Sequence, residues 1–151
     1  MTGREPKEQN DLFFLCSLIE YIGRKTKNHR NVVVNALGKK ELLHIYDLAD
    51  VYHSENIDKV SDELIEKYDI EEGRWDNVAD CRYAIPTHWD IGKVYKRLII
   101  AVAENEKRPY IDILTEVYNS WLSRKIEDLN SSLYYENPAY LYESYRKGDV
   151  L

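Results

Sequence analysis

The sequence predicts an all-α protein, a compact single-domain bundle of six or seven helices. Its clearest signal is apolar residues recurring every three or four positions through two long segments, at about residues 87–104 and 109–130. Only a short break, residues 105–108, separates them. Two long amphipathic helices joined by a short loop form an antiparallel hairpin. We therefore expect the rest of the chain to pack on this hairpin.

Capping residues mark both arms of the predicted hairpin. Thr87 stands where a helix N-cap should stand, and Asp90 completes a capping box, in which each side chain bonds the other's backbone N–H. Pro109 suits the first turn of the second arm. The residues expected to face the core are Ile91, Val94, Tyr95, Leu98, Ile99 and Val102 in the first arm, and Ile111, Leu114, Val117, Tyr118, Trp121, Leu122 and Leu129 in the second.

The N-terminal part of the chain is polar as far as residue 9, so we expect residues 1–9 to be a disordered tail and residues 10–151 to form the domain. Asn10 or Asp11 can cap a first helix that Gly23 would end. This helix is apolar nearly all round, which is typical of a helix buried on most sides. We expect it to be the most buried partner of the hairpin.

Three further helices and one long loop complete the prediction. Asn31 and Gly38 are typical of the two ends of a short helix over residues 32–37, although its three valines also favour a strand. Helices are predicted over residues 39–53 and 57–68, followed by an irregular loop over residues 69–85. Residues 132–151 form a tyrosine-rich arm with a last helix from Pro138 to Lys147.

The composition excludes several classes of protein. With 151 residues and a net charge of −6, the chain has no run of 18 apolar residues and no apolar core of a signal peptide near its start. Its two cysteines make no disulfide framework. We expect a cytoplasmic protein that does not contact a membrane and needs no cofactor.

The charges are unevenly distributed. Residues 41–80 hold thirteen acidic residues against three basic ones, whereas residues 24–40 hold six basic residues and no acidic one. The basic stretch is a candidate nucleic-acid contact, the alternative function, although the helix after it carries carboxylates that would repel phosphates. Its residues are Arg24, Lys25, Lys27, Arg30, Lys39 and Lys40.

The tyrosines are the feature that core building explains least. The chain has 13 tyrosines and 2 phenylalanines, and five of the tyrosines lie near the C-terminus. Tyrosine has an apolar ring and a polar tip, and is enriched at protein interfaces for that reason. The candidate protein interface comprises Tyr134, Tyr135, Tyr140, Tyr142 and Tyr145.

No pattern indicates catalysis or metal binding. His44, Asp47, Asp50 and His53 lie at steps of three on one predicted helix, so the outer two point to opposite sides and cannot bind one metal ion. The grouping of Asp80, Cys81 and His88 in the sequence suggests an enzyme that uses residues 69–88, as a less favoured alternative. We therefore predict no catalytic, cofactor-binding or metal-binding residue.

Three segments carry a family resemblance: Leu15 to Tyr21, Ile91 to Tyr95, and Tyr134 to Pro138. They resemble uncharacterised small all-helical proteins of bacterial accessory genomes. The resemblance implies a bacterial protein associated with mobile elements, and it transfers no functional residue.

The aromatic C-terminus, the uneven charge and the missing catalytic pattern favour a non-enzymatic protein-interaction or regulatory module. The expected partner is another protein or a second copy of the chain.

Overall fold

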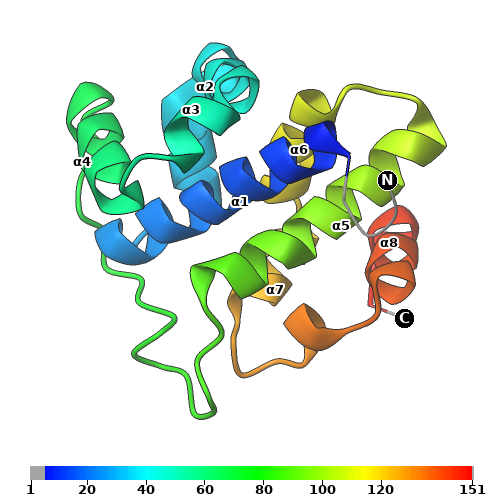
Figure 1. Ribbon diagram of the computed structural model, residues 1–151. Coiled ribbons are helices and arrows are strands. Elements are labelled where there is room, and N and C mark those ends of the chain that lie inside the picture. The colour runs from blue at the N-terminus through cyan, green and yellow to red at the C-terminus, as the bar shows by residue number, and fades with distance from the viewer. Residues whose placement is uncertain (1–5, 151) are drawn as a thin grey trace.

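The computed structural model describes residues 6–150, and within them every regular element is a helix. This confirms the all-α prediction (Figure 1). The elements are α1 (Lys7–Thr26), α2 (Arg30–Asp47), α3 (Ala49–His53), α4 (Ile57–Lys67), α5 (His88–Glu106), α6 (Tyr110–Tyr118), α7 (Trp121–Glu127), the short 3-10 helix η1 (Leu133–Tyr135) and α8 (Pro138–Lys147).

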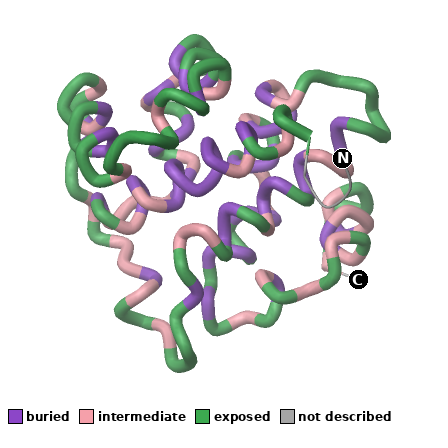
Figure 2. Tube along the Cα trace, viewed as in Figure 1, coloured by how far each residue is buried: buried purple, intermediate pink, exposed green. Residues whose placement is uncertain are grey.

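Helices α1 and α5 form the centre of the molecule. They run side by side in opposite directions (Figure 1) and make the most extensive contact between any two elements. Gly92 of α5 lies so close to α1 that a Cβ atom there would be 2.8 Å from the backbone of Ser17. Figure 2 shows both helices as largely buried, which confirms that the first helix is the main partner of residues 87–104.

The predicted hairpin is present, but its second arm is broken. Thr87 and Asp90 form the predicted capping box at the start of α5. The arm after Pro109 consists of α6 and α7, which are separated at residues 119–120. There the Asn119 amide donates to the Thr115 carbonyl and the Ser120 hydroxyl to the Val117 carbonyl. Side chains that bond the preceding turn in this way compete with helix propagation, which accounts for the break.

Helix α2 joins the two helices predicted on either side of Gly38. It is helical over residues 32–37, so the helix interpretation is confirmed over the strand, but it begins after His29 rather than at Asn31. Gly38 has φ 75° and ψ 165°, which bends the helix sharply. Only glycine adopts this backbone conformation without strain. The predicted helix over residues 39–53 is divided between the rest of α2 and α3.

The limits of α1 differ from the prediction at both ends. The helix begins at Lys7, so residues 7–9 are not part of a disordered tail, and residues 1–5 lie outside the described part of the chain. Asn10 and Asp11 do not cap it. Instead, the Lys7 ammonium donates to the buried Asp11 carboxylate one turn further on. The helix continues past Gly23 to Thr26 because Lys27, in a left-handed conformation, ends it.

The long loop is fixed against the body of the molecule. The backbone N–H of Gly73 donates to the Thr26 carbonyl at 2.7 Å, and that of Trp75 donates to the Lys27 carbonyl at 3.0 Å. These two bonds attach the loop to the end of α1. The last helix, α8, spans the predicted residues, with Asn137 at its N-cap and Gly148 at its C-cap. No helix among residues 6–150 is long and apolar enough to cross a membrane.

Candidate functional site

The C-terminal arm forms one wall of a pocket of about 240 Å³ between α5, η1 and α8, which we call the C-terminal pocket. Buried Leu133 and Leu141 fix η1 and α8 against the core on either side of it. The pocket is lined by Asp90, Lys93, Val94, Arg97, Tyr134, Tyr135, Glu136, Pro138 and Leu141.

Two of the predicted interface tyrosines meet at this pocket. The rings of Tyr134 and Tyr135 stack with their centroids 4.2 Å apart. Burial and a hydrogen bond with Tyr135 raise the pKa of Tyr134 to about 12, so its hydroxyl remains protonated at neutral pH. The Tyr135 side chain is 65% exposed, the largest exposed fraction among the large hydrophobic residues that the structure describes. A stacked tyrosine therefore presents a fixed apolar surface to solvent.

Two cations stand beside these rings. Lys93 and Arg97 lie one turn apart on the exposed face of α5, and neither makes an ion pair within residues 6–150. The two carboxylates of the pocket are engaged locally. Asp90 accepts the backbone N–H of Thr87 at 2.8 Å, and Glu136 accepts the Ser132 hydroxyl at 3.3 Å. The pocket thus offers two uncommitted positive charges next to aromatic and aliphatic walls.

The other three tyrosines of the arm do not enlarge this surface. Tyr140, Tyr142 and Tyr145 lie on α8, are half-buried and pack against the hydrophobic core. Burial raises the pKa of Tyr145, which agrees with that placement. Elsewhere Tyr95 and Tyr118 fill the core itself, with ring centroids 4.0 Å apart. Much of the unusual tyrosine content is therefore used in packing.

The structure disperses the predicted nucleic-acid contact. Lys25 lies 2.6 Å from both Asp58 and Asp62 of α4, and Lys27 lies 3.5 Å from Glu72. These pairs account for the acidic segment that follows the basic one in the sequence, because the two segments lie against each other.

The remaining four basic residues divide between the interior and the surface. Arg30 is completely buried and its guanidinium lies 3.1 Å from the Glu20 carboxylate. Arg24 is half-buried, and two of its guanidinium nitrogens have no partner within residues 6–150. Lys39 pairs with Asp112 at 2.8 Å, whereas Lys40 is exposed and makes no ion pair with any described residue. These six cations do not form one accessible basic surface.

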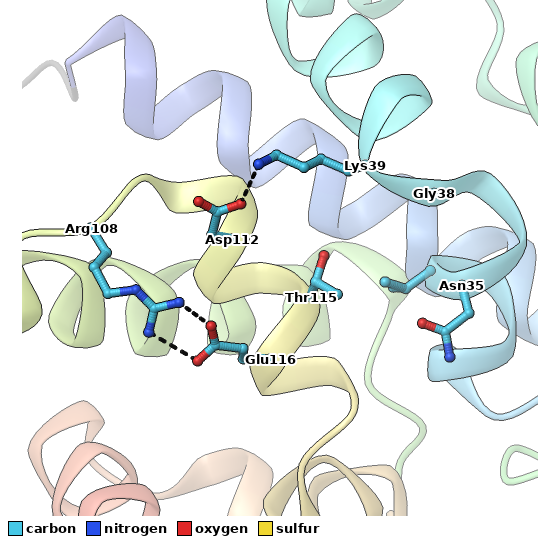
Figure 3. Close-up of a pocket in the computed structure, with 8 residues that line it drawn as sticks. Asn35, Gly38, Lys39, Arg108, Asp112, Thr115 and Glu116 are labelled. Carbon is cyan, nitrogen blue, oxygen red and sulfur yellow. Dashed lines mark hydrogen bonds and ion pairs between the residues drawn. The ribbon is translucent and has the colours of Figure 1, made fainter.

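A larger but less specific pocket lies between α2 and α6 (Figure 3). Its volume is about 420 Å³, and the labelled Lys39, Arg108, Asp112 and Glu116 lie around it. Lys39 pairs with Asp112, and both terminal guanidinium nitrogens of Arg108 pair with the Glu116 carboxylate. Because each charge already has a partner of opposite sign, a charged ligand would have to displace an existing pair.

A third pocket, of about 280 Å³, lies where the loop meets α2 and α7, and we call it the His29 pocket. His29 Nδ1 lies 2.7 Å from the Glu127 carboxylate, which also accepts the backbone N–H of Arg30 at 2.9 Å. Trp75 stacks on the imidazole, and Asn77 donates to the Glu127 carbonyl. Sequence reasoning missed this group because His29 and Glu127 are 98 positions apart and share no motif.

No hydrogen bond or ion pair joins any two of Asp80, Cys81 and His88, the residues named for a possible enzyme. Asp80 lines the His29 pocket, whereas the Cys81 thiol donates to the Tyr83 carbonyl at 3.4 Å. His88 packs edge-on to Tyr21, with ring centroids 4.9 Å apart. The other set tested for metal binding is also dispersed, since His44 packs near Tyr52 and His53 stacks on Phe14. Among residues 6–150 no group of three or more His, Cys, Asp or Glu residues is arranged to bind a metal ion.

No family model, no curated protein and no solved structure gives a significant match to this chain.

Proposed function

We propose that this protein is an interaction module that binds a segment of another protein at the C-terminal pocket. The observation that carries the proposal is the exposed Tyr135 ring, held by stacking on Tyr134 beside two unpaired cations. Aromatic residues and arginine are enriched at protein interfaces, and the residues that contribute most to affinity are often of these types.

The chemistry of the pocket favours an acidic segment with an apolar residue next to its carboxylate. Lys93 and Arg97 would pair with the carboxylate, while Val94 and Leu141 provide an apolar contact. Charge complementarity of this kind mainly increases association rate and specificity. The nucleic-acid alternative is not favoured, because phosphates would have to replace the carboxylates that now pair with Lys25, Lys27, Arg30 and Lys39.

A library of random 16-residue peptides displayed on phage tests this proposal. We expect the wild-type protein to enrich acidic peptides that contain an aliphatic or aromatic residue. Tyr135→Ser and Arg97→Glu should each abolish the enrichment. Val51→Ser is the matched control, since Val51 is also an exposed apolar residue but belongs to α3. It should enrich the same peptides as the wild type.

Two results would contradict the proposal: no reproducible enrichment, or the same enrichment with Tyr135→Ser. Enrichment that depends on Tyr135 but shows no preference for acidic peptides would support the pocket as a binding site and contradict the proposal that its partner is acidic. Sedimentation velocity of the full chain then distinguishes the remaining case, a second copy as partner. If the wild type dimerises and Tyr135→Ser is monomeric, self-association uses this pocket.

A further inference from the structure

A carboxylate fixes the orientation of the His29 imidazole from inside the molecule. The Glu127 side chain is 2% exposed and its Oε2 lies 2.7 Å from His29 Nδ1. Its other oxygen accepts the backbone N–H of Arg30 at the start of α2. Because an ionised carboxylate only accepts hydrogen bonds, Nδ1 must donate. In the neutral imidazole the lone pair is therefore on Nε2.

A second contact fixes the plane of the ring. Trp75 stacks on the imidazole with centroids 4.1 Å apart and an angle of 24° between the planes. The Trp75 backbone is in turn bonded to Lys27, two residues before His29. The imidazole is thus held by one hydrogen bond in its plane and one aromatic contact on its face.

His29 lines the pocket, and only one of its two ring nitrogens is engaged by Glu127. Nε2 makes no hydrogen bond with any residue the structure describes, and the side chain is 31% exposed. The charged side chains around the same pocket are Asp80, Arg124 and Asp128, in addition to Glu127. Among residues 6–150, Arg124 is the only lysine or arginine that lines the pocket, and no serine, threonine or cysteine of that range lines it.

We propose that the His29 pocket is a small-molecule site in which His29 Nε2 is a general base. A general base needs a free lone pair within reach of the reacting group and a partner that stabilises the protonated form. The pocket supplies both, with Glu127 as the positioning residue. Glu127 is buried behind the partly exposed imidazole and accepts hydrogen bonds from His29 Nδ1 and from the Arg30 backbone N–H, which hold its carboxylate where it stabilises the protonated ring.

The reaction class that fits these groups is hydrolysis of a small carboxylic ester. Nε2 takes a proton from a water molecule as its oxygen bonds to the ester carbonyl carbon. The bond from that carbon to the leaving oxygen then breaks, and the leaving alcohol receives the proton from Nε2. Arg124 lines the pocket and donates from one terminal guanidinium nitrogen to Asn31 Oδ1 at 3.3 Å, and its remaining N–H groups would stabilise the negative charge on the carbonyl oxygen. Only water is consumed besides the ester.

Hydrolysis of p-nitrophenyl acetate by the full chain tests this proposal. We expect His29→Gln to reduce the protein-dependent rate at least tenfold, a conservative loss for a general base, which typically contributes about 10²- to 10⁴-fold. His44→Gln is the matched control, because His44 is exposed and lies outside this pocket, and it should retain the wild-type rate. A wild-type rate no higher than that of an equal concentration of free imidazole would overturn the proposal, as would an unchanged rate in His29→Gln.

A second measurement does not depend on the choice of substrate. Diethyl pyrocarbonate acylates the free imidazole nitrogen, and mass spectrometry gives the rate for each histidine. We expect His29 to react faster than the more exposed His44, and Glu127→Gln to slow His29 selectively while a normal circular dichroism spectrum shows that the variant is folded. If His29 is the slower of the two in the wild type, its role is structural and the proposal is wrong.

Discussion

The cations of residues 24–40 and those of α5 differ in what surrounds them. In the sequence the first group is the more prominent, with six basic residues and no acidic one. In the structure most of its members pair with carboxylates of the same chain, and one, Arg30, is completely buried. Lys93 and Arg97 make no ion pair with a described residue.

This difference shows that local charge density is a poor guide to a free charged surface. A basic segment in an acidic protein attracts the acidic segments of its own chain. Here the ion pairs of Lys25 join α4 to the end of α1. Lys93 and Arg97 are a weaker signal in the sequence, but both cations remain available to a partner. Changes in the paired members of the first group should therefore alter stability, and changes in the second group should alter binding alone.

The largest expected effect is that of Arg30→Met. The substitution keeps an unbranched apolar stem but removes the guanidinium, and so leaves Glu20 buried near Glu127 without its paired cation. Breaking a buried ion pair from one side typically costs about 3–5 kcal/mol. Urea denaturation should show this loss, while Lys40→Met, the exposed control, should change the free energy of unfolding by less than about 0.5 kcal/mol. Similar values for the two variants would mean that Arg30 contributes no more than a surface residue.

Gly23→Ala should have an intermediate effect. A Cβ atom at this position would lie 2.3 Å from the Arg30 side chain, so the buried arginine would have to move. Overpacking of this kind costs about 1–3 kcal/mol, which outweighs the gain of up to about 1 kcal/mol from replacing glycine in a helix. Thermal denaturation measures the net loss. In an Arg30→Met background the penalty should shrink or reverse, and an unchanged penalty would show that the strain has another source.

A smaller effect should depend on pH. Burial and the Arg24 guanidinium lower the pKa of His88 in the folded protein, against an opposing effect of Asp90. The unfolded chain therefore takes up this proton at a higher pH than the folded chain. The contribution to stability is complete above the ordinary histidine pKa of 6.5 and is lost as the pH falls through the lower folded value.

Melting temperatures at pH 7.5 and pH 5 test this effect. His88→Gln should lose less stability than the wild type between the two values, because glutamine does not titrate. Arg24→Met should also reduce the loss, since it removes the neighbouring positive charge. Parallel curves for all three proteins would contradict the expectation.

The smallest effects on stability should come from the C-terminal pocket. Lys93→Ala, Arg97→Ala and Tyr135→Ser each remove an exposed group, so each should change the free energy of unfolding by less than about 0.5 kcal/mol. Binding of the selected peptides should nevertheless fall strongly. If these variants are instead as unstable as Gly23→Ala, the pocket residues support the fold and the distinction between the two groups of cations fails.

Local signals in the sequence predicted much of the fold. The capping box at Thr87, the Asn137 cap and the interruption of helical geometry at Gly38 depend on residues within four positions of one another, so the sequence contains all the information they need. The predicted start of α1 was wrong because Asn10 and Asp11 are residues typical of helix N-caps that here lie inside the helix. Here Asp11 pairs with Lys7 inside the helix.

The sites were less predictable because they depend on distant residues. The sequence names Tyr134 and Tyr135 as part of the aromatic arm, but Lys93 and Arg97, which line the same pocket, lie about forty residues earlier. The His29 pocket combines the N-cap residue of α2, the long loop, α7 and the residues that follow α7, and no spacing in the sequence relates His29 to Glu127. Which distant side chains meet is determined by how the helices pack, and the spacing of residues in the sequence does not reveal that packing.

Because Gly92 packs closely on Ser17, this protein should tolerate substitutions less well at that contact than at its pockets. The C-terminal pocket and the His29 pocket lie on different elements. Mutations in one therefore leave the other intact, and the two pockets can diverge separately. Both nevertheless rest on the closely spaced pair α1 and α5, since α2 packs on the former and α8 on the latter. A larger residue at that crossing would part the two central helices and shift both surfaces at once. Over long evolutionary times we expect this small contact to change less than either site.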